Sequence, residues 1–199
     1  MNALFGPLDS RNCVLPRQQT RAAAFLISAH GALARQFAFT LPMKLTSAWQ
    51  TELNAQVYRE AEIVSLLLRA TSWVPDLALT CMVASWETAW LPSPLEGIPD
   101  RTLATATGLA TLAHAVHAKI RPAALLPTEA NSNDPFVMAL RRIEFENGRL
   151  LQAQTVFLKS PELVSFRSAV NSALERRHTE IGKLWAQALE GVGINLRAE

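Results

Sequence analysis

Apolar residues recur at helical spacing near the end of the chain. They follow Ser160 and Pro161, a capping residue and a proline suited to the first helical position, and they precede Gly191, a residue typical of helix ends. Successive apolar positions lie about one or two turns apart: Phe166, Val170, Leu174, Ile181, Trp185 and Leu189. We expect a C-terminal amphipathic helix within an extension, residues 161–199, that packs on a main domain of residues 1–160.

Two earlier segments also favour helix. Residues 21–37 are rich in alanine and leucine, which are strong helix formers, although Gly31 predicts a break within them. Asp100 is a good N-cap for a helix from Arg101 to Lys119. That helix must stop before Pro122, because the residue that precedes a proline is disfavoured in the helical conformation.

Elsewhere the pattern indicates strands. Residues 37–49 alternate apolar and polar positions around Pro42, as expected of an edge strand. Residues 58–68 favour helix by propensity alone. However, a Ser/Pro/Asp break at residues 72–76 joins this run to residues 77–91, which are rich in Thr, Val and Trp, and the two runs together fit a long hairpin.

Residues 141–158 can be interpreted as a helix or as a second hairpin. Asn147 and Gly148 favour the hairpin, because a type I′ turn needs a positive φ at both central positions and these two residues tolerate it. The paired strands then carry polar side chains on both faces: Arg141, Gln152, Gln154 and Thr155. We expect a sheet curved around a polar-lined cavity, or else a hairpin with ordinary solvated charges.

The composition of the chain predicts a hydrophobic core and argues against some classes of partner. With 199 residues, of which 49% are hydrophobic, the chain is long and apolar enough for one domain with a real core, in which at least three of the five tryptophans should pack. The elements above predict an α+β fold: an antiparallel curved sheet with helices on one face, plus the C-terminal helix. The net charge of +2 is spread along the chain and does not favour a nucleic-acid partner. The apolar residues 103–118 are too few to span a membrane, so we expect a cytoplasmic protein.

Histidines offer candidate metal ligands. His114 and His117 form an HxxH pair on one helix face, but a metal site needs further ligands, and only His30 and distant carboxylates are available. Glu175 and His178 form only half of the motif that a di-iron bundle requires. We therefore expect no metal, with His114 and His117 partly buried in structural roles and the other pair on a solvated or interfacial helix face.

Several short motifs occur in the order found in one enzyme family. They are HGALARQF at residues 30–37, Tyr58-Arg59-Glu60, LPSPLEG at residues 91–97, RPAALL at residues 121–126 and RIEFENGRLLQAQTVFLKSPEL at residues 142–163. Over residues 26–163 the chain thereby resembles the chorismate lyase family, whose fold is shared by the ligand-sensing domain of a large class of bacterial transcription regulators.

The resemblance implies a lyase that removes pyruvate from chorismate and leaves 4-hydroxybenzoate, without a cofactor. Arg59 matches the family's carboxylate-binding arginine, and a planar, permanently charged guanidinium suits that task. Leu33 and Ala123 fall in motifs that shape the family's substrate pocket. Thr155 stands where the family has its active-site glutamate, which is the main departure from the pattern.

Three hypotheses follow. The first is a lyase for chorismate or a related aromatic acid, with Arg59 and Thr155 as its catalytic residues. The second is a non-catalytic relative with a pocket that binds a small aromatic acid or serves as a regulatory sensor, and this pocket is lined by Arg141, Gln152, Gln154 and Thr155. The third is a helical interaction protein whose C-terminal helix docks on a partner or on a second copy of the chain.

Overall fold

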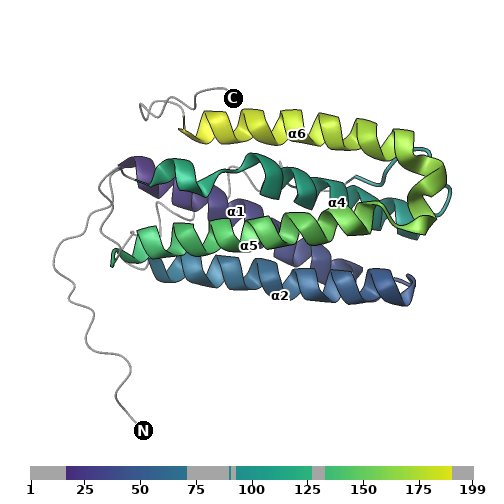
Figure 1. The fold of residues 1–199 in the computed structure, drawn as a ribbon, viewed down its shortest axis with the longest axis horizontal. Coiled ribbons are helices and arrows are strands. Elements are labelled where there is room, and N and C mark those ends of the chain that lie inside the picture. Colours follow the sequence, from purple (N-terminus) through teal and green to yellow (C-terminus); the bar gives the residue numbers. More distant parts are fainter. Residues whose placement is uncertain (1–16, 71–89, 91–92, 127–132, 190–199) are drawn as a thin grey trace, which may run out of the picture.

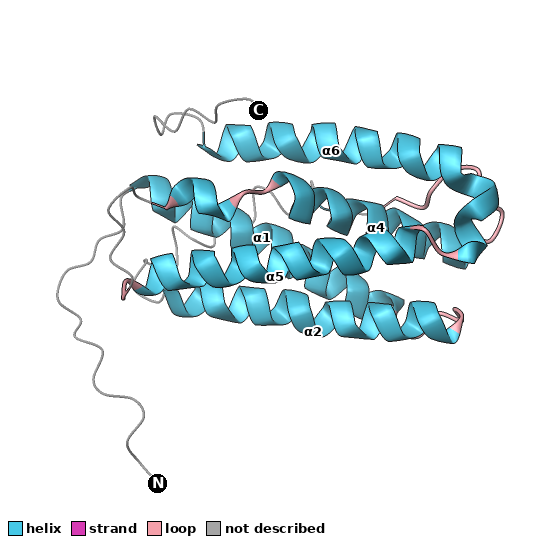
Figure 2. Ribbon diagram, in the orientation of Figure 1, coloured by secondary structure: helices cyan, strands magenta, loops and turns pink. Residues whose placement is uncertain are grey.

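The chain forms a bundle of α-helices (Figure 1). The computed structural model describes residues 17–70, 90, 93–126 and 133–189. The long helices are α1 (Arg17–Thr40), α2 (Ser47–Ala70), α4 (Arg101–Lys119), α5 (Pro135–Leu158) and α6 (Arg167–Leu189). The short 3-10 helices η2 (Pro122–Leu125) and η3 (Pro161–Phe166) precede α5 and α6. Figure 2 shows no strand in the described residues, so the α+β prediction with its curved sheet is wrong and the fold is all-α.

Aspartate caps fix where two of the helices begin. The Asp100 carboxylate accepts hydrogen bonds from the backbone N–H groups of Thr102 and Leu103, at 2.8 and 3.1 Å, as the sequence predicted for α4. Asp134 does the same for α5, where the backbone N–H of Phe136 donates at 2.7 Å and a proline occupies the first helical position.

The helices pack so that α4 lies at the centre of the bundle. α1 packs along α2, α2 along α5, and α4 contacts α1, α5 and α6 (Figure 1). The segment before α4 folds back onto this helix, and the Leu95 backbone N–H donates to the Ala104 carbonyl at 2.9 Å. Gly108 permits this approach, because a Cβ atom there would lie 2.1 Å from the carbonyl oxygen of Ser93.

The strand predicted at residues 37–49 is instead the end of α1, a turn, and the start of α2. Pro42 lies in the turn, where its missing N–H does not interrupt a helix. Residues 58–68 are helical within α2, so their propensity was the better guide, while the expected partner run at residues 77–91 lies outside the described residues except for Trp90. α1 also runs through Gly31 without the expected break.

The predicted hairpin at Asn147 and Gly148 is also wrong, since both residues lie in the middle of α5. The apolar residues around them recur at spacings of three, four and seven and face the core: Phe136, Leu140, Ile143, Leu150 and Phe157. Gly148 lies on the exposed side of the helix, with no atom within 4 Å of the position of a Cβ. The helical repeat of apolar residues, and not the Asn-Gly turn signal, determines the secondary structure of this segment.

The C-terminal helix is confirmed as α6. Most of its apolar residues, Trp185 among them, are buried, and the helix packs on α4 and α1. This face is therefore already occupied within the chain. Trp49 and Trp90 are buried as well, which confirms the expectation that at least three tryptophans pack in the core. No helix in the described part of the chain combines the length and hydropathy needed to cross a membrane.

Candidate metal centre

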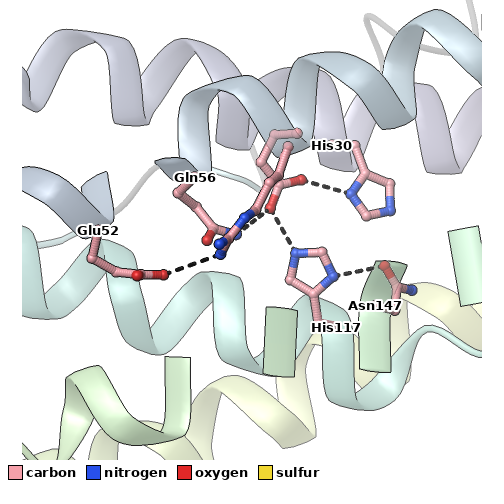
Figure 3. Close-up of polar contacts among 7 residues, drawn as sticks. His30, Glu52, Gln56, His117 and Asn147 are labelled. Carbon is pink, nitrogen blue, oxygen red and sulfur yellow. Dashed lines mark hydrogen bonds and ion pairs between the residues drawn. The ribbon is translucent and has the colours of Figure 1, made fainter. Parts of the chain in front are cut away.

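Three helices bring polar side chains together in the middle of the bundle (Figure 3). His30 lies on α1, Glu60 on α2 and His117 on α4, and the three side chains have no exposed surface. Each of the three lies on the buried face of its helix. Glu60, for example, lies between the buried residues Gln56 and Ile63 on one face of α2. The core is thus built around a fully buried carboxylate and two imidazoles.

Both oxygens of the Glu60 carboxylate accept hydrogen bonds from the imidazoles. His30 Nδ1 lies 2.8 Å from Oε2, and His117 Nε2 lies 2.6 Å from Oε1. Gln56 Nε2 donates to Oε1 at 3.0 Å, one turn away on the same helix. On the far side of His117, Nδ1 lies 2.8 Å from Oδ1 of Asn147 on α5, so a fourth helix orients this ring (Figure 3).

Burial and charge set the protonation of the three groups. Burial alone raises the pKa of Glu60, but the charge of His117 and the hydrogen bonds from both imidazoles outweigh it and hold this pKa far below its usual value. Burial lowers the pKa of His117, whereas the carboxylate of Glu60 raises it by more. For His30 burial wins and the pKa falls. The centre is therefore an ion pair between the Glu60 carboxylate and the His117 imidazolium, and the neutral His30 donates a further hydrogen bond to the carboxylate.

The donor atoms of these groups suit a metal ion. One atom each from His30, Glu60 and His117 lies within 4.8 Å of the others. Two imidazole nitrogens and one carboxylate oxygen are a ligand set used by zinc enzymes and by non-haem iron proteins. Asn147 and Gln56 act as outer partners, because each fixes the orientation of one ligand.

A second pair of histidines lies where α4 meets α6. His114 Nδ1 is 3.1 Å from His178 Nε2, and the two partly exposed rings are stacked. Burial, followed by the charge of His178, lowers the pKa of His114 to about 4. Glu175 is exposed, as expected for a solvated helix face, and takes no part in the pair.

The residues that the sequence placed in a substrate pocket are spread over several elements. Leu33 is buried in α1, and Arg59, on α2, forms an ion pair with Glu52 at 3.4 Å. Ala123 is exposed in η2. The remaining four lie on α5. Arg141 and Gln152 are exposed, and Gln154 is buried. The Thr155 hydroxyl donates a hydrogen bond to the Leu151 carbonyl. The final hairpin that was to align them is a helix.

Sequence reasoning found part of this centre and missed the rest. His117 and His30 were noted as metal-ligand types, but Glu60 was assigned only to the family motif beside Arg59. The available signal was the helical repeat Leu53, Gln56, Glu60, Ile63 and Leu67, which places two polar residues in an apolar stripe. A buried polar residue in such a stripe indicates a partner on another helix.

Fold and site together define an all-α bundle with a buried histidine–glutamate–histidine centre. Comparison of the chain with protein families, curated proteins and solved structures finds no match. The resemblance to chorismate lyases, and the lyase and acid-binding functions that it implies, stay predictions.

Proposed function

We propose that this protein binds one divalent transition-metal ion in the core of its bundle, with His30, Glu60 and His117 as ligands. The supporting observation is the convergence of three ligating side chains from three helices, with donor atoms within 4.8 Å of one another and no exposed surface. Helical bundles build metal sites in this manner, from inward-facing side chains on neighbouring helices.

The donor set favours zinc or ferrous iron. Imidazole nitrogens suit these borderline ions, whereas calcium and magnesium take oxygen ligands almost alone. The negative charge of Glu60 offsets part of the charge of the ion in a core that otherwise holds mainly apolar side chains.

Protons hold the ligand atoms together before an ion binds. The gaps of 2.6 and 2.8 Å around Glu60 are hydrogen-bond distances. Neighbouring ligands of a tetrahedral ion with bonds of about 2.0–2.2 Å lie roughly 3.3–3.6 Å apart. Binding would therefore displace the proton that His117 shares with Glu60, require the Nδ1 proton of His30 to leave or to move to Nε2, and move these ligand atoms apart by about 0.5–1 Å. Asn147 would still hold Nδ1 of His117, which keeps the ring oriented.

Metal titration of the full-length protein tests this function. Metals are first removed with a chelator, and Zn²⁺ is then added. After gel filtration the protein is expected to retain one Zn²⁺ per molecule, measured by elemental analysis. Co²⁺ in its place should give the visible absorption bands of nitrogen and oxygen coordination. Zn²⁺ should also raise the unfolding temperature, because an ion present at 100 times its Kd adds about 2.7 kcal/mol to the stability of the folded state.

Matched variants separate this centre from other histidines. His30→Gln removes one ligand and should weaken Zn²⁺ binding by about 100-fold or more, since even an outer partner contributes 10- to 100-fold. His178→Gln removes a partly exposed histidine of α6 and should leave the affinity unchanged. Failure of the wild type to retain any ion, or equal affinity in His30→Gln, would reject the proposal and leave a purely hydrogen-bonded centre.

A further inference from the structure

A small cavity lies beside the centre, between α1, α2, α4 and α5. Its volume is about 10 Å³, enough for roughly one water molecule. The lining residues are Phe37, Glu52, Leu53, Gln56, Ala110, Gln154 and Phe157. Three of these side chains are polar, although the cavity lies among the apolar core residues of the bundle.

Three buried amide atoms around this cavity lack partners within the described residues. Gln154 is 2% exposed, and neither its Nε2 nor its Oε1 has a hydrogen-bond partner there. The same holds for Oε1 of Gln56, which is 1% exposed. A buried amide without a partner is costly. Two such amides at one cavity therefore indicate a polar or charged occupant.

The cavity continues a polar line along α2 to the centre. Glu52, Gln56 and Glu60 are four residues apart, which places them on one face of the helix. Figure 3 shows Glu52 and Gln56 together on one side of the two histidines. Glu52 is the outer end, since its side chain is 25% exposed and is paired with Arg59. Gln56 is the inner end, because its amide donates to Glu60.

We infer that this line is the route by which the metal ion enters and leaves the centre, with Glu52 attracting the cation at the surface and the amide oxygens of Gln56 and Gln154 holding it in the cavity. The inference rests on the proposed function. Side chains that contact an ion only in transit stabilise the passage and not the bound state. Their loss changes the association and dissociation rates by the same factor and leaves the Kd unchanged.

Stopped-flow kinetics with Co²⁺ test the route. Absorbance after mixing gives the association rate, and excess chelator gives the dissociation rate. Gln154→Leu keeps the approximate size of the side chain and removes both polar atoms. It should slow both rates by about tenfold, comparable to one lost polar partner, with an unchanged Kd. Gln152→Leu, an exposed change on the same helix, should have wild-type rates.

A surface variant keeps the test independent of core packing. Glu52→Gln should slow association most at low salt, whereas Glu62→Gln, at a half-exposed position of α2, should not. Wild-type rates in Gln154→Leu would overturn the route and leave metal binding intact. Faster dissociation with a weaker Kd would make Gln154 part of the bound site and also overturn it. No Co²⁺ binding by the wild type would overturn the proposed function itself.

Discussion

Glu60 is the residue on which the buried centre depends. It carries a full charge in the core, and three side chains donate to its two oxygens: His30, Gln56 and His117. Removal of one partner of such a buried pair is costly, because the other is left charged or unpaired away from water. The same contacts would hold the carboxylate ready for a cation.

Replacement of Glu60 by glutamine should destabilise the metal-free protein strongly. Glutamine keeps the size of the side chain but removes the charge that raises the pKa of His117. We expect Glu60→Gln to lower the free energy of unfolding by about 3–5 kcal/mol, the usual cost of breaking a buried ion pair. Urea unfolding in the presence of a chelator, followed by circular dichroism, measures this loss.

Glu62→Gln is the matched control on the same helix. Glu62 pairs with Arg142 at 3.4 Å, but both side chains are about half exposed, so the change should cost less than about 1 kcal/mol. Similar small losses in the two variants would show that the Glu60 contacts do not stabilise the fold.

Helix α5 shows why the sequence predicted a hairpin where the chain forms a helix. Asn147 and Gly148 form a strong turn signal, but a glycine in a helix costs only about 0.5–1 kcal/mol relative to alanine. A fully buried large apolar side chain contributes about 1.5–3 kcal/mol, and α5 buries several. The repeat therefore outweighs the turn. Asn147 has another partner, since its side chain contacts His117 on α4.

Alanine at Gly148 should stabilise the protein. In the middle of α5, with nothing within 4 Å of a new Cβ, Gly148→Ala gains helix propensity and should raise the free energy of unfolding by about 0.5–1 kcal/mol. In a type I′ turn the same change would be destabilising, because alanine resists a positive φ. A thermal or urea unfolding curve distinguishes the two.

Gly108→Ala provides the contrast in another helix. The new Cβ would lie 2.1 Å from the Ser93 carbonyl oxygen, so the segment before α4 must shift and the protein should lose stability. If both alanine variants were more stable than the wild type, helix propensity alone would explain the changes, and the close contact between Gly108 and Ser93 would not limit stability.

At the scale of the molecule, the sequence predicted α4 and α6 but not the bundle. Caps and repeats are local, so Asp100 and the apolar stripe of α6 could be interpreted without knowledge of the fold. The centre is not local: Glu60 contacts histidines that lie 30 and 57 residues away in the chain. Such pairings depend on how whole helices pack, which the spacing of residues within one helix does not reveal.

The junction between α4 and α6 should make stability depend on pH. Burial lowers the pKa of His114 to about 4 and also lowers that of His178, next to Lys119. Both values lie below the ordinary 6.5 of the unfolded chain. Between about pH 6.5 and 4 the unfolded state therefore binds more protons than the folded state, and the stability from this pair is lost as pH falls.

The double variant His114→Gln/His178→Gln isolates this effect from the other titrating groups. His117 opposes it, because its raised pKa favours the folded state as pH falls, but that contribution is common to both proteins. We expect the free energy of unfolding to fall more between pH 7 and pH 5 in the wild type than in the variant, measured by urea unfolding with a chelator present. Equal losses would mean that α6 stays docked on α4 without regard to the charge of the two histidines.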